Sequence, residues 1–237
     1  LYKNSLAQDG SSNDLRPKLR KISAPGMLLF AFPLTFAAFD WLMSLDPHWF
    51  STIYGVYVFG GTVVAVISFL TILILDLKRR GVLADTISVE HYHDMGKLLF
   101  AFSVFWAYIA FSQFFLIWYA NLPEETEHYV RRMAHGWTLI FYLNPIFSFV
   151  FPFVLLLGTA SKKHTATLVQ VASVVILGRW LDAYLMVAPT AGPAPSWPIA
   201  AAGASLAVLA GMLLIVRPLL LAGTGVTPVS AQNMHSR

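Results

Sequence analysis

Cysteine is absent from the 237-residue sequence, so the chain cannot form a disulfide, hold an iron–sulfur cluster, build a cysteine zinc site or attach a c-type haem covalently. Charge is also scarce: 12% of the residues are charged and 57% are hydrophobic, with a mean hydropathy of +0.64. These values lie outside the range of soluble globular proteins. The composition therefore excludes a water-soluble enzyme and predicts a polytopic membrane protein.

Six nearly charge-free segments each have about the 20 residues that a helix needs to cross the hydrocarbon core of a bilayer. Prolines, Lys–Arg runs and interfacial tryptophans separate them. The sequence predicts an all-α integral membrane protein, a four-helix bundle plus flanking helices. The six transmembrane helices are expected at 26–45, 50–75, 98–120, 137–157, 165–187 and 197–221. They form one membrane domain at 26–221, between a basic segment at 1–25 and a tail at 222–237.

Basic residues set the expected orientation. Thirteen of the sixteen Lys and Arg fall in the two ends and in the loops that an even number of spans places on the same side. The opposite side has Arg131 and Arg132, and Arg179 lies inside a span. By the positive-inside rule, the chain is expected in a cell inner membrane with both of its ends on the cytoplasmic side. The net charge of +4 then marks cytoplasmic loops and not nucleic-acid binding. The chain begins with Leu and a polar segment, so further helices are expected upstream.

Polar groups inside spans are costly, so their depth is informative. At about 1.5 Å per residue, Asp40 and Arg179 are expected at one level, close enough to pair. Tyr57, Gln113 and Asn144 are expected to reach the same layer in the outer third of the membrane. Carboxylates and a histidine lie just above this layer: Asp46, His48, Glu124, Glu125 and Asp182.

The alternative for this layer is structural: interhelical hydrogen bonds that hold a bundle together, with Arg179 paired to Asp182 at i+3 on its own helix. A second polar set lies near the cytoplasm, and most of its members are expected in solvated loops: Asp76, His91, His93, Asp94, Lys97 and Gln170. All seven histidines lie outside or at the edge of the spans, which excludes the paired imidazoles of a b-type cytochrome. No metal site is predicted.

Two long strings carry a resemblance: FDWLMSLDPHWFSTIYG at 39–55 and LLFAFSVFWAYIAFSQFFLIWYANLPEET at 98–126, with FPFVLLL at 151–157. Together they resemble the NrfD/PsrC-like membrane family, specifically the quinone-binding ActF subunits of alternative complex III. The resemblance covers the first five spans, and 197–237 resembles the family only loosely. It implies a ten-helix subunit with two four-helix bundles, of which this chain is the second half.

Family members work in complexes that oxidise quinol and pass the electrons to cytochrome c or a similar carrier. The resemblance implies quinone, either menaquinone or ubiquinone, as cofactor, with no haem or cluster in this chain. It implies a homologous quinol-site subunit, iron–sulfur and c-type haem subunits and the lipid bilayer as partners. Oxidation of a quinol releases two protons, so we expect proton acceptors at Asp40, Asp46 and His48. Candidate quinone contacts are Trp41, Tyr57, Gln113, Asn144 and Arg179, and a candidate proton path is Glu124, Glu125 and Asp182.

Two other functions stay open. A secondary transporter needs a substrate site near the midplane between broken helices, for which Pro33, Pro145 and Pro152 supply possible kinks, although no inverted repeat is apparent. A structural membrane anchor for redox partners needs the buried polar groups only as interhelical contacts.

Overall fold

The computed structural model describes residues 16–81, 87–134 and 136–192, and every regular element in them is helical. Five helical spans in this part are long and apolar enough to cross a membrane: Pro17–Leu45, Tyr54–Arg79, Val89–Ala120, Thr138–Leu156 and Thr165–Ala191. Five of the six predicted segments are thereby confirmed as candidate spans of a multi-pass helical protein. The sixth, 197–221, lies outside the described residues.

The chain divides into two compact units, and the second, Ala31–Ala194, contains every feature discussed below. Of the other unit, the described part is residues 16–30, which belong to helix α2 (Arg16–Ala37). Residues 16–25, predicted as a basic segment before the first span, are thus helical. After α2 the chain continues into a π-helical turn, η1 (Ala38–Leu42), and a short 3-10 helix, η2 (Met43–Leu45).

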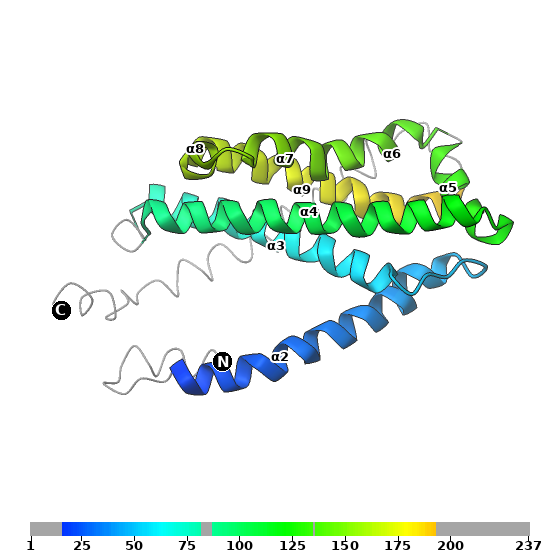
Figure 1. Ribbon diagram of the computed structural model, residues 1–237, viewed down its shortest axis with the longest axis horizontal. Helices are drawn as coiled ribbons and strands as arrows, with labels where there is room; N and C mark the ends of the chain where they lie inside the picture. The colour runs from blue at the N-terminus through cyan, green and yellow to red at the C-terminus, as the bar shows by residue number, and fades with distance from the viewer. Residues whose placement is uncertain (1–15, 82–86, 135, 193–237) are drawn as a thin grey trace. The chain divides into compact units, whose positions relative to one another are not determined.

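Three long helices form the centre of the second unit: α3 (Tyr54–Arg79), α4 (Val89–Ala120) and α9 (Thr165–Val187). Figure 1 shows α4 running lengthwise, with α3 on one side and α6, α7 and α9 on the other. α3 packs against both α4 and α9. The core between them is built from aliphatic and aromatic side chains, with Val64, Leu99, Trp106, Leu168 and Val175 among its buried members.

Helix α4 begins nine residues before its predicted span. Ser88 and His91 form a capping box, in which the Ser88 backbone N–H donates to His91 Nδ1 at 3.2 Å. The expectation of loop positions for His91, His93 and Asp94 is therefore wrong, because these residues occupy the first turns of α4. Polar residues hide this helix start in a hydropathy profile. At 32 residues α4 is longer than a membrane crossing requires.

Between α4 and the next span lies a short amphipathic helix, α5 (Pro123–Met133). α4 ends where Asn121 adopts the left-handed conformation at φ 50°, and Pro123 begins α5 at a position that needs no backbone N–H. Glu124 and Glu125 occupy the first turn of α5, and its two arginines occupy the last turn. This order of charges complements the helix dipole and supports a short helix where the sequence predicted only a loop.

The fourth span is helical throughout, but its hydrogen-bonding pattern changes between its two prolines. α6 (Thr138–Pro145) passes into a π-helical segment, η3 (Ile146–Val150), and then into α7 (Phe151–Leu156). Pro145 and Pro152 lack the N–H that a regular helix needs. α8 (Thr159–Lys163) leads into α9, and η4 (Ala188–Ala191) follows α9. In contrast, α2 continues through Pro33 as an α-helix.

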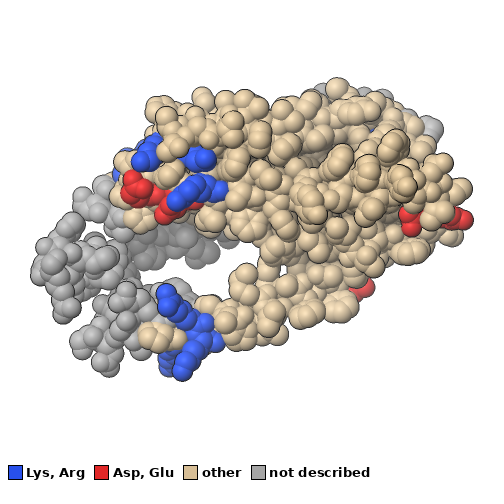
Figure 2. All heavy atoms as spheres, viewed as in Figure 1, with Lys and Arg blue, Asp and Glu red and all other residues tan. Residues whose placement is uncertain are grey.

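Charged side chains in the second unit gather at the two ends of the long helices. Figure 2 shows a broad uncharged surface over the middle of this unit, with Lys, Arg and acidic groups toward the α8 end and acidic groups at the α5 end. An uncharged band between charged ends is the pattern of a bundle surrounded by hydrocarbon.

Candidate ligand cavity and its polar network

Asp182 is the centre of a buried polar network on α9. Its side chain is 4% exposed, and its Oδ1 accepts hydrogen bonds from the Tyr57 hydroxyl of α3 and from Asn144 Nδ2 of α6, the latter at 2.6 Å. Its Oδ2 accepts from Arg179 Nη1 at 3.1 Å, one turn earlier on α9. Three helices therefore satisfy one carboxylate inside the bundle.

Arg179 holds the same network together from the other side. Its Nη2 donates to Ser148 Oγ at 2.6 Å and to Asn144 Oδ1 at 3.3 Å. Its guanidinium carbon lies 3.8 Å from the centre of the Trp106 ring, a cation–π contact. Ion pairing, hydrogen bonds and ring contact together offset the desolvation of this cation.

Two glycines make room for Arg179. A Cβ at Gly61 of α3 would lie 2.8 Å from Arg179 Nη1. A Cβ at Gly178 of α9 would lie 2.6 Å from Ser148 Oγ and 3.0 Å from the Ser148 backbone nitrogen. α9 and η3 therefore approach closely at Gly178, which brings Ser148 within reach of the guanidinium.

A cavity of about 640 Å³ lies beside this network, between α3, α4, α5, α6 and α9. Its volume falls within the range of about 300–1,000 Å³ typical of small-molecule sites. Aromatic side chains are the largest group in its walls: Tyr54, Trp106, Tyr108, Phe111, Phe114, Tyr129, Phe141, Tyr142 and Phe149. A smaller group of polar side chains interrupts them: Tyr57, Gln113, His128, Arg132, Asn144 and Asp182.

The cavity reaches the outer surface of the bundle between α4 and α6. Tyr108 and Phe111 of α4 and Tyr142 of α6 line the cavity and are each more than half exposed. These residues lie within the candidate spans Val89–Ala120 and Thr138–Leu156. The rim is therefore aromatic and faces the region that hydrocarbon would fill.

Helix α5 closes one end of the cavity. Arg132 is buried and donates from Nε to the Leu185 carbonyl oxygen at 3.0 Å and from Nη2 to the Met186 carbonyl oxygen at 3.3 Å. These carbonyls lie in the last turn of α9, where a cation is favoured by the helix dipole. Arg132 Nη1 also donates to His128 Nδ1 at 2.9 Å, so this nitrogen acts as an acceptor.

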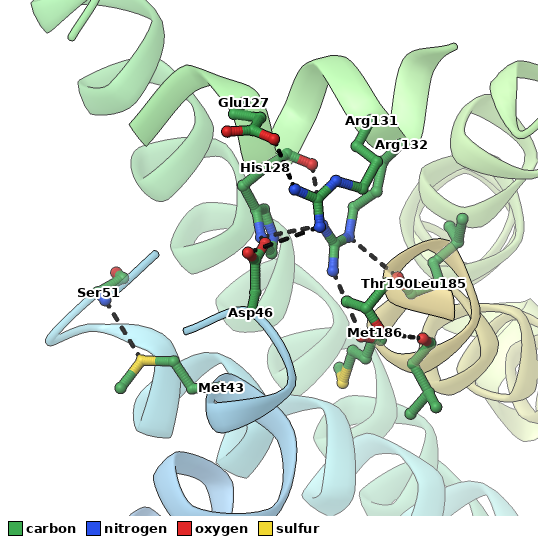
Figure 3. A network of polar contacts seen from close by, with 11 residues as sticks. Met43, Asp46, Ser51, Glu127, His128, Arg131, Arg132, Leu185, Met186 and Thr190 are labelled. Atoms are coloured by element: carbon green, nitrogen blue, oxygen red, sulfur yellow. Dashed lines mark hydrogen bonds and ion pairs between the residues drawn. The ribbon is translucent and has the colours of Figure 1, made fainter. Parts of the chain in front are cut away.

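A second cluster joins α5 to the segment after η2. The His128 ring stacks on Trp49 with 3.6 Å between ring centres, and His128 Nδ1 lies 3.4 Å from Asp46 Oδ2. Arg131 Nη1 lies 3.6 Å from Asp46 Oδ1, and Arg131 Nη2 donates to Glu127 Oε1 at 2.7 Å. Figure 3 shows these groups in one continuous series of contacts from Glu127 to the end of α9.

Burial and charge together hold His128 neutral. Burial, followed by the cations of Arg132 and Arg131, lowers the pKa of His128 from 6.5 to about 2. Burial likewise lowers the pKa of Arg132. Tyr129 also lines the cavity, and burial raises the pKa of its hydroxyl, which stays protonated.

The structure brings together part of the predicted layer. Tyr57, Asn144 and Arg179 meet as expected from their depth, and the alternative pairing of Arg179 with Asp182 is confirmed. Gln113 lines the cavity beside them. Arg179 itself lies behind the wall and positions two residues that line it.

The predicted pair between Asp40 and Arg179 is wrong. Asp40 lies in η1 with an exposed side chain, whereas Arg179 is buried against Asp182, Asn144 and Ser148. Rise along a helix predicts only a level, and the direction of a side chain around the helix axis is not set by depth.

The other candidates divide between the buried clusters and the surface. Asp46 is buried beside His128. Trp41, His48 and Glu124 are exposed, and Glu125 is partly buried in the first turn of α5. None of these four lines the cavity.

His128 and Arg132 are the main site residues that sequence reasoning missed, since they were counted as part of an outer loop. Their signal is the i,i+4 spacing of His128 and Arg132 in a segment that begins with Pro-Glu-Glu and ends with Arg-Arg. That pattern indicates an amphipathic helix with one face available for burial.

Comparison with protein-family models and with curated proteins finds no match for this chain.

Proposed function

We propose that this chain is a membrane subunit that binds quinone or quinol in the cavity between α4, α6 and α9. The observation that carries the proposal is an aromatic cavity of about 640 Å³ at membrane depth, with a few buried polar groups at one side. Such a site suits a flat ring that carries polar oxygens and an apolar tail. The resemblance of 39–55 and 98–126 to quinone-binding subunits supports the same ligand.

The chain's residues fit such a ligand in three respects. The aromatic rim between α4 and α6 gives a membrane-dissolved molecule access from the side. The walls offer ring faces for stacking. The Gln113 side-chain oxygen is buried and has no hydrogen-bond partner among the described residues, so the wall retains an unused acceptor.

In this proposal the chain belongs to a quinol:electron-acceptor oxidoreductase of the alternative complex III type, with cytochrome c or a similar carrier as acceptor. Haem and iron–sulfur groups are held by partner subunits, and the chain forms part of a ten-helix subunit. α5 faces the outside of a cell inner membrane and both ends face the cytoplasm, in keeping with the distribution of Lys and Arg.

Quinol oxidation supplies two protons as well as electrons, and the chain offers a route for protons away from the cavity. His128 lines the cavity and touches Asp46, whose carboxylate is buried. Arg131 links Asp46 to Glu127, which is exposed on α5. Asp46 is the group in this series that can hold a proton at Oδ2 and release it toward the surface.

The test is to fill the cavity and measure ligand binding. Ala110→Phe adds a ring to a residue that lines the cavity, and Ala101→Phe makes the same change at an exposed position of α4 outside it. Binding of short-chain quinone analogues to the purified protein in lipid nanodiscs should weaken by at least about tenfold in Ala110→Phe and stay unchanged in Ala101→Phe. Wild-type affinity in both variants would exclude this cavity as the quinone site.

A further inference from the structure

Gln113 places in the cavity wall a buried amide oxygen that has no hydrogen-bond partner among the described residues. The residue is 5% exposed, on the face of α4 that lines the cavity. Its Oε1 accepts no hydrogen bond from any group in the described part of the chain. A buried acceptor without a hydrogen bond carries a desolvation penalty, and a ligand that donates a hydrogen bond to it would offset that penalty.

Most other polar groups of the wall already have partners. Both carboxylate oxygens of Asp182 accept hydrogen bonds, from Tyr57, Asn144 and Arg179. Arg132 donates to carbonyl oxygens of α9 and to His128. A ligand therefore gains little by competing for these groups, and more by meeting an acceptor that is unused.

One donor in the wall is also unused. Trp106 lies two turns before Gln113 on α4, is 3% exposed, and its indole Nε1 has no partner among the described residues. A carbonyl oxygen can accept from Trp106 but cannot donate to Gln113. A hydroxyl can do both. The two redox forms of a quinone differ in this respect, because the oxidised form has carbonyl oxygens and the reduced form has hydroxyls.

We propose that Gln113 Oε1 accepts a hydrogen bond from a ring hydroxyl, so that the cavity binds a quinol more tightly than the corresponding quinone. This inference rests on the proposed quinone site and adds the redox form that the site selects. Gln113 is then a residue that determines specificity. The oxidised product, a quinone, leaves the Gln113 amide oxygen without a partner, and this favours release of the quinone.

The experiment compares the two redox forms in direct binding. Dissociation constants of decyl-ubiquinone and decyl-menaquinone analogues, each oxidised and reduced, are measured under argon with the protein isolated from its membrane together with its partner subunits. The wild type should bind each reduced form about tenfold more tightly, equivalent to about 1.4 kcal/mol. Gln113→Leu should bring the two affinities to within about twofold by weakening only the reduced form.

Gln170→Leu is the matched control, because Gln170 is exposed on α9 and does not line the cavity. It should keep the wild-type preference. Gln113→Met serves as a second variant of similar length and should behave as Gln113→Leu does.

Equal affinities of the wild type for both forms would overturn this inference while leaving the quinone site in place. A preference that persists in both Gln113 variants would also overturn it, since another group would then select the reduced form. Binding of neither form to the wild type would overturn the quinone site and this inference together.

Discussion

Arg179 and Asp182 lie one turn apart on α9, and their side chains meet at 3.1 Å between Nη1 and Oδ2 inside the bundle. The side chain of Arg179 is 6% exposed and that of Asp182 is 4% exposed. The pair is thus a buried ion pair whose partners come from one helix and whose further hydrogen bonds come from α3, α6 and η3. Such a pair is costly to break from one side, because the remaining charge stays buried.

Removing one partner should therefore harm the protein more than removing both. Asp182→Leu should lower the free energy of unfolding by about 3–5 kcal/mol, and the double change Asp182→Leu with Arg179→Met should cost less. Unfolding in mixed detergent micelles gives the values. Asp76→Leu is the control, since Asp76 pairs with Arg80 at an exposed position and should change stability by less than about 1 kcal/mol. A double variant less stable than Asp182→Leu would contradict the account of this pair.

Gly178 should be far less tolerant of a methyl group than Gly60. A Cβ at Gly178 would meet the Ser148 backbone nitrogen at 3.0 Å, whereas at Gly60 the nearest atom is in the Phe105 ring at 3.3 Å. A ring can shift by a few tenths of an ångström more easily than a backbone. Gly178→Ala should cost about 1–3 kcal/mol of unfolding free energy and separate η3 from α9, while Gly60→Ala should cost less. Equal losses of unfolding free energy in the two variants would contradict a close approach of η3 to α9 at Gly178.

The neutral state of His128 predicts a loss of stability at mildly acidic pH. The folded protein resists protonation of this ring, because the pKa of His128 is lowered from 6.5 to about 2, whereas the unfolded chain takes up a proton near pH 6.5. Stability is therefore complete above pH 6.5 and falls as the pH is lowered below it. Thermal unfolding at pH 7.5 and 5.0 measures the slope.

His128→Gln removes the titrating group and should make the stability of the protein less dependent on pH over this range. Asp46 and Arg131, which face His128, remain in that variant and serve as the internal control for other titrations. An unchanged slope in His128→Gln would mean that other groups cause the pH dependence.

The distribution of basic residues predicts opposite sides for Ser88 and Glu127. Ser88 precedes α4 and Glu127 lies on α5, and the absence of native cysteine makes single-cysteine labelling direct. An impermeant thiol reagent added outside intact cells should label Glu127→Cys and leave Ser88→Cys unlabelled. Labelling of position 88 alone would reverse the topology.

Hydropathy was enough to find the five spans in the described part of the chain, because it needs only composition along the chain. The span 165–187 coincides with α9, and the π-helical segment between Pro145 and Pro152 fits the backbone N–H groups that these prolines lack. Depth, at a constant rise per residue, also brought Tyr57 and Asn144 to the level of Arg179.

Hydropathy and depth do not predict the direction in which a side chain points around its helix axis. Asp40 is exposed on η1, since nothing in its own sequence decides which side of η1 packs against α3. α5 escaped notice because 11 residues are too few to register as a span. The burial of Arg132 depends on the end of α9, which lies beside it in the fold and is distant in the sequence.

Photoaffinity labelling tests the central claim most directly, because it asks where a quinone lies in the unmodified protein. An azido-quinone added to the protein in its native membrane should label peptides of α4 and α6 that contain Tyr108, Phe111 or Tyr142. An excess of the unlabelled quinol should suppress this labelling. Labelling confined to the exposed surface of α2, or labelling of α4 and α6 that unlabelled quinol does not reduce, would contradict a quinone site in this cavity.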